Sequence, residues 1–110
     1  MPNMAYTVKL TKDAKRQLDN IVYYIYFILM NPFAADSFLN DYTETLRRLS
    51  RVADGLAFCE DEELCKLNLR IIHFKTHSYK LLYHTKGSVA IIDAIYHNKQ
   101  ELKPPKTMVK

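Results

Sequence analysis

Tryptophan is absent from this chain of 110 residues, and glycine, proline and cysteine are scarce, with two, four and two copies. So little glycine and proline argues against long disordered stretches. Cys59 and Cys65 lie outside the usual spacing of zinc ligands and have no second pair, so no metal site is predicted. Two free thiols and the absence of a signal peptide predict that the protein is located in the reducing cytoplasm. The apolar run at residues 21–30 is too short to span a bilayer, so no membrane is expected as a partner.

The chain contains enough apolar material for a core. Hydrophobic residues make up 48% of the sequence, and the length fits a single domain over residues 1–110. The formal net charge is +4, with a basic tail at about residues 98–110. A basic balance favours a polyanionic or acidic partner, such as nucleic acid, the ribosome or an acidic protein. The alternative is a merely solvated basic surface.

The first half of the chain is predicted to form one strand and two helices. Residues 6–10 alternate between apolar and polar side chains, as in a strand. Thr11 then suits a helix N-cap, and the following apolar residues keep the helical period as far as residue 29. Asn31 suits a cap and Pro32 a first helical position, so a second helix begins at once. Its predicted buried stripe consists of Ala35, Phe38, Leu39, Tyr42, Leu46 and Leu49. Two helices with so short a join form an antiparallel hairpin.

The second half is predicted to be a loop followed by three strands. Residues 53–66 are acidic and irregular, with room for one helical turn. Strands are expected at about residues 67–74, 79–84 and 89–96. The order βααβββ gives an α+β fold, with the helical hairpin packed on one face of a mostly antiparallel four-stranded sheet. The other face of the sheet, or its edge, is expected to stay open.

The first helix has more aromatic residues than one buried face can use. Tyr23, Tyr24, Tyr26 and Phe27 surround its apolar stripe. One interpretation is a core helix that is well wrapped by the rest of the protein. The other is an exposed aromatic patch that docks another protein chain.

Candidate chemistry lies on the last three predicted strands. His97 ends the last strand and is suited to act as an acid or base, and strand alternation places Asp93 on the same side. Arg70, Lys80 and Lys99 lie on or just after strands of the same sheet, where convergent cations would grip phosphates or stabilise developing negative charge. The alternative for each is a solvated surface side chain. No metal and no cofactor is predicted, because ligand spacing is missing among the other histidines, which are His73, His77 and His84.

An ordered series of short segments carries a family resemblance. The chain resembles the RelE/ParE superfamily of bacterial toxins from type II toxin–antitoxin systems over about residues 5–101. Taken together, in order and at the right intervals, the segments are fairly specific. They are residues 6–11 (YTVKLT), residues 21–25 (IVYYI), Asn31-Pro32 with Ala34-Ala35, residues 69–70 (LR), residues 79–83 (YKLLY) and residues 91–97 (IIDAIYH).

The resemblance implies one of two activities. RelE-like members cut messenger RNA on the ribosome without a metal, using basic residues on the sheet and a His or Tyr near the end of the last strand. In this chain that site would consist of His97 as acid or base, with Arg70, Lys80 and Lys99 as charge stabilisers. Lys80 and Lys99 stand where such members carry Arg, and Asn98 where some carry a catalytic Tyr; lysine does not reproduce the bidentate fork of arginine. ParE-like members keep the fold, largely lack these residues and inhibit DNA gyrase.

The resemblance therefore implies a toxin of a type II toxin–antitoxin, or plasmid-stabilisation, system. The expected activity is ribosome-dependent mRNA cleavage by a metal-independent endoribonuclease, an mRNA interferase. The alternatives are a gyrase inhibitor with no catalytic activity of its own, and a degenerate toxin that only binds its antitoxin. Expected partners are the cognate antitoxin, in a toxin–antitoxin hetero-oligomer, and either the ribosome with mRNA or DNA gyrase.

Overall fold

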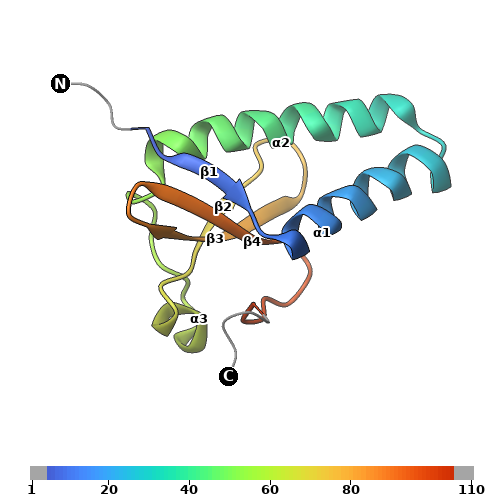
Figure 1. The fold of residues 1–110 in the computed structure, drawn as a ribbon. Coiled ribbons are helices and arrows are strands. Elements are labelled where there is room, and N and C mark those ends of the chain that lie inside the picture. The colour runs from blue at the N-terminus through green and yellow to red at the C-terminus, as the bar shows by residue number, and fades with distance from the viewer. Residues whose placement is uncertain (1–4, 106–110) are drawn as a thin grey trace.

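A four-stranded sheet lies under two long helices in the computed structural model, which describes residues 5–105 (Figure 1). The predicted α+β order βααβββ is confirmed, and the helical turn expected inside the acidic loop is a short helix, α3. In chain order the elements are β1 (Thr7–Leu10), α1 (Lys12–Tyr23), the π-helical turn η1 (Tyr24–Ile28), α2 (Pro32–Val52), α3 (Glu62–Lys66), β2 (Arg70–His73), β3 (Tyr79–Lys86) and β4 (Val89–His97). Within residues 5–105, no helix is both long enough and apolar enough to cross a bilayer.

The sheet is mixed, with the strand order β1-β4-β3-β2. The last three strands pair antiparallel, as predicted, and β1 joins the edge of β4 in parallel. Strand β2 is shorter than the predicted residues 67–74 because Asn68 adopts a left-handed backbone with φ of 59°. The backbone N–H of Cys59 donates to the carbonyl of Leu69 at 2.8 Å, so the chain enters β2 from a closed loop.

Both long helices bury their apolar stripes against one face of the sheet. The predicted caps are present: Thr11 accepts a hydrogen bond from Ala14 N at 3.1 Å, and Asn31 accepts one from Ala34 N at 3.0 Å. These caps satisfy N–H groups that a helix start leaves unpaired. On α2 the predicted stripe is confirmed, since four of its members are buried and Leu39 and Leu46 are partly buried against the core. The main core therefore lies between the hairpin and the sheet.

The opposite face of the sheet, which we expected to stay open unless its edge did, is partly covered. A second, smaller core there contains Cys59, Leu64, Leu69, Leu82 and Ala94, and Leu102 packs against it. The cause is that the segment around α3 and the chain after β4 fold back over this face. Figure 1 shows α3 on the side of the sheet away from α2. The predicted basic tail begins with residues 98–105, and its last five residues lie outside the described part of the chain.

The far end of the helical hairpin extends beyond the sheet (Figure 1). No strand among residues 5–105 lies beneath it, so its apolar side chains stay exposed, up to 86% for Phe33 and 81% for Met30. The interpretation of a fully wrapped core helix is therefore wrong, and an exposed aromatic patch is present. We call this patch the aromatic tip and define it by its exposed members, Tyr23, Tyr24, Tyr26, Phe27, Ile28, Leu29, Met30 and Phe33.

Candidate functional site

His97 lies at the end of β4 with one ring nitrogen occupied. Its Nδ1 accepts a hydrogen bond from the backbone N–H of Lys99 at 3.1 Å, which leaves Nε2 for other partners. Its ring packs edge-on against Tyr79, with ring centres 5.2 Å apart. Tyr79 is itself part of the core under the hairpin. His97 is therefore half-buried on the helix-covered face of the sheet, at its end.

Asp93 does not share the side of His97, and the prediction from strand alternation is wrong. Between β3 and β4 the pairing changes register, from Leu82↔Ala94 to Tyr83↔Ile92, so Asp93 is an extra residue in a β-bulge. The bulge resets the alternation that the prediction assumed. Asp93 instead makes a hydrogen bond of 2.6 Å with Nδ1 of His84.

Lys80 and Lys99 both lie near His97 at the end of the sheet. Lys80 pairs with Tyr96 in the sheet, one position from the Tyr79–His97 pair, so its side chain lies on the face opposite to the hairpin. Its Nζ reaches the carbonyl of Asn98 at 3.5 Å. Lys99 follows in the exposed turn after β4. The structure thus brings three of the four predicted site residues to one end of the sheet.

Arg70, the fourth, is held elsewhere by the end of α2. Its guanidinium donates a hydrogen bond of 2.8 Å to the carbonyl of Ala53, the residue that caps α2, and lies over the ring of Phe58 at 4.2 Å. The hydroxyl of Tyr83 donates to the same carbonyl at 2.7 Å. Burial raises the pKa of Tyr83 to about 12, so this hydroxyl remains a donor at neutral pH. A cation at the negative end of a helix is stabilising, and this is the contact that Arg70 makes.

We expect Arg70→Ala to destabilise the folded protein by about 1.5–3 kcal/mol, because it removes a charged hydrogen bond and exposes the face of Phe58. Urea unfolding followed by circular dichroism measures this change. Lys99→Ala, which removes an exposed cation from the turn after β4, is the control and should alter stability by less than about 0.5 kcal/mol. Equal stability of the two variants would contradict a structural role for Arg70.

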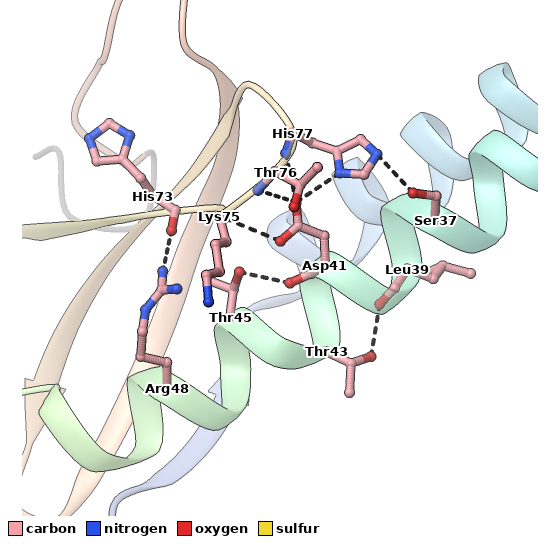
Figure 2. Close-up of polar contacts among 10 residues, drawn as sticks. All are labelled: Ser37, Leu39, Asp41, Thr43, Thr45, Arg48, His73, Lys75, Thr76 and His77. Carbon is pink, nitrogen blue, oxygen red and sulfur yellow. Dashed lines mark hydrogen bonds and ion pairs between the residues drawn. The ribbon is translucent and has the colours of Figure 1, made fainter.

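The structure also contains a buried polar contact that the sequence reading missed. Asp41, on the buried side of α2, accepts hydrogen bonds from three successive backbone N–H groups of the β2–β3 turn, at Lys75, Thr76 and His77, with distances of 2.7–3.1 Å (Figure 2). Its Oδ2 also lies 2.7 Å from Nδ1 of His77. The sequence did contain one sign that Asp41 is buried, because this carboxylate lies between Phe38 and Tyr42, two positions of the predicted apolar stripe. Its hydrogen-bond partners could not be identified in this way, since they are more than thirty residues away along the chain.

The pKa values of Asp41 and Asp93 are shifted in opposite directions, although both side chains are buried. Burial acts to raise the pKa of Asp41, but the hydrogen bonds from His77, Thr76 and Lys75 together lower it below its ordinary value. For Asp93, burial raises the pKa, and the opposing contact with His84 does not overcome it. Asp41 therefore favours its charged form in the folded protein, whereas Asp93 disfavours it.

These shifts predict opposite effects of pH on stability. Asp41 stabilises the fold at pH values above the pKa that it has in the unfolded chain. This contribution is lost as the pH falls through the lower pKa that Asp41 has in the folded protein. Asp93 contributes stability at pH values below the pKa that it has in the unfolded chain. This stability is lost as the pH rises through the higher pKa that Asp93 has in the folded protein. At pH 7, we expect Asp41→Asn to cost about 1–3 kcal/mol and Asp93→Asn to cost less, in urea unfolding measurements. A larger cost for Asp93→Asn would overturn this assignment.

Comparisons with known proteins agree with the fold and identify the family. The solved structure described as the chromosomal ParDE toxin–antitoxin system of P. aeruginosa is similar with a TM-score of 0.67 and 23% identity, over 86% of this chain and 97% of that one. The RelBE2 toxin–antitoxin complex of Mycobacterium tuberculosis is similar with a TM-score of 0.54 and 19% identity, over 84% of this chain and 91% of that one. At these identities the likeness concerns the fold. No curated protein sequence matches the chain.

The decisive comparison is with a family model. The model described as the ParE toxin of the type II toxin–antitoxin system parDE matches residues 8–102. The chain therefore belongs to the ParE toxin family and is a toxin of a type II toxin–antitoxin system.

Proposed function

We propose that this toxin arrests growth as ParE-like proteins do, by binding DNA gyrase rather than by cutting messenger RNA. The observation that carries the proposal is the position of Arg70. A nuclease would need this cation beside the scissile phosphate, yet its guanidinium is bound to the Ala53 carbonyl and stacked on Phe58. The match of the ParE family model to residues 8–102 supports the same choice.

Ribosome-dependent mRNA cleavage is the second candidate, and the end of β4 favours it. Because Nδ1 of His97 accepts from the Lys99 backbone N–H, Nε2 carries the hydrogen of the neutral ring and is left to donate to a phosphate oxygen. Lys80 and Lys99 supply positive charge at the same end of the sheet. In this reading the 2′-hydroxyl of the message loses its proton and attacks the adjacent phosphate, which forms a 2′,3′-cyclic phosphate. The bond from phosphorus to the 5′-oxygen of the next nucleotide breaks, that oxygen gains a proton, and His97 serves as the acid or base for one of these transfers.

The proposed partner in the resting state is a cognate antitoxin, as in the two similar toxin–antitoxin structures. The aromatic tip supports a protein partner because eight large apolar side chains, each at least 44% exposed, lie close together in sequence there. Exposed patches of this kind are typical of protein interfaces. We propose that the antitoxin covers this tip, which blocks the toxin in a hetero-oligomer.

Two parallel assays on purified toxin test the proposed target. One follows supercoiling of relaxed plasmid by gyrase, and the other follows message cleavage in a cell-free translation reaction. We expect inhibition of supercoiling with intact message. Cleaved message with normal supercoiling would replace the proposal by the nuclease, and activity in neither assay would favour a degenerate toxin that only binds its antitoxin.

A further inference from the structure

A cleft of about 420 Å³ lies between α2 and the β2–β3 turn. The turn is next to the end of β4, since the backbone N–H of Asn98 donates to the carbonyl of Ser78 at 2.9 Å. Figure 2 shows the α2 side of this region with the turn above it. Residues at helical spacing along α2 form one wall, and the turn forms the other. The basic lining residues are Arg48, Arg51 and Lys75, and the lining also includes Ser37, Asn40 and His77.

The two acidic residues of the cleft already have partners. Asp41 accepts four hydrogen bonds from the turn, and its side chain is only 5% exposed. Glu44 forms an ion pair with Arg47, its neighbour on α2. Their negative charges are therefore compensated from within the protein, and they do not oppose an anion as free carboxylates would.

The remaining polar groups of the cleft are mainly donors. Arg48 uses one nitrogen to donate to the carbonyl of His73, and its planar group carries further N–H donors. Arg51 and Lys75 are exposed. Ser37 and Asn40 add a hydroxyl and an amide on the same wall. Several N–H and O–H donors around one cleft suit a ligand with several anionic oxygens.

The wall that carries Lys75 is fixed before any ligand arrives. Asp41 binds three consecutive backbone N–H groups of the turn, which holds residues 75–77 in one conformation. A preformed site does not spend binding energy on ordering a loop. The volume of the cleft also falls within the range of small-molecule sites.

We propose that this cleft binds a phosphorylated small molecule, with Arg48, Arg51 and Lys75 contacting its phosphate oxygens. The lining of this cleft includes neither the aromatic tip nor His97, Lys80 or Lys99, so the proposal does not depend on the proposed target. Ser37, His77 and Asp41 also follow one another in hydrogen-bonding order, with Ser37 Oγ 3.5 Å from His77 Nε2. Ser37 lies inside α2, where neighbouring backbone N–H groups are used by the helix and do not form an oxyanion hole, so we assign no catalysis to these residues.

The test uses the isotope-labelled full chain and follows its backbone amide signals by NMR at neutral pH. Inorganic pyrophosphate and adenosine diphosphate are the probes, and a single-stranded oligonucleotide is the third arm. We expect saturable shifts centred on Lys75, Thr76 and His77 with both small probes. The Arg51→Gln, Lys75→Gln double variant should weaken their binding at least about tenfold, because it removes two charged contacts but no side-chain hydrogen bond of the fold.

Lys86→Gln, which removes an exposed cation from the end of β3, is the matched control and should leave affinity within about twofold. Equal weakening by this control would overturn the site in favour of diffuse attraction to a basic protein. Shifts that fail to saturate, or that centre on Lys99, would also overturn it. Much tighter binding of the oligonucleotide than of either small probe would replace the small molecule by a nucleic acid strand.

Discussion

A toxin that carries both His97→Ala and Lys80→Ala should still arrest growth when it is expressed alone. The proposed gyrase binder needs no proton transfer at the end of β4, so removing the imidazole and the ammonium leaves its mode of action intact. His97 is half-buried at a strand end and Lys80 makes one long contact, of 3.5 Å, so the double variant should also fold. Colony counts after induction, with circular dichroism of the purified variant, measure both expectations.

The nuclease reading predicts the opposite result for the same variant. If these residues act on the scissile phosphate, each of the two substitutions should remove at least about 1.4 kcal/mol of transition-state stabilisation, which lowers the cleavage rate at least about tenfold. Toxicity and message cleavage would then disappear together while the fold remains. Wild-type toxin serves as the positive control, and its own failure to arrest growth would favour the degenerate toxin instead.

Charged substitutions at the aromatic tip should separate the toxin from its antitoxin. Phe27 and Phe33 are 59% and 86% exposed, so Phe27→Asp with Phe33→Asp removes few contacts within the toxin itself. In a protein interface, the same change buries two carboxylates and loses two aromatic contacts. We expect antitoxin affinity to fall at least about a hundredfold, ~2.7 kcal/mol, by calorimetry with the purified partners.

In cells, this double variant should remain toxic when the antitoxin is co-expressed. Ala57→Asp provides the control, because it adds a carboxylate at an exposed position in the segment between α2 and α3, away from the tip. Full neutralisation of the tip variant by the antitoxin would show that the antitoxin binds elsewhere. Loss of toxicity in the tip variant alone would instead indicate that the tip contacts the target.

Local sequence signals were sufficient for most of the backbone of this fold. Alternation identified β1, and the Thr11 and Asn31 caps fixed the starts of α1 and α2, because a cap depends only on neighbouring N–H groups. The apolar stripe of α2 also placed the hairpin on one face of the sheet. The same local signals did not decide whether the aromatic residues of α1 and η1 are buried, since their burial depends on how far the sheet reaches beneath the hairpin.

Contacts between distant segments were not accessible from the sequence. Arg70 gave the pattern of a cation on a strand, but its partner is a carbonyl at the end of α2. Asp93 was assigned to the wrong side because a single bulge residue reverses strand alternation, and no local composition marked the bulge. Three predicted site residues do lie at one end of the sheet, while the Asp41 contact with the turn required the three-dimensional structure.

The parallel pairing of β1 with β4 has a consequence for how the toxin is made. Thr7 pairs with Val89 and Leu10 with Ile92, so the first strand to leave the ribosome finds its partner only when the last strand has emerged. Pairing across so long a stretch of chain is slow compared with forming the helical hairpin. The hairpin with its aromatic tip can therefore form during translation, before the sheet is complete. An antitoxin that is present during translation would then meet the proposed docking surface on a nascent toxin that is not yet fully folded.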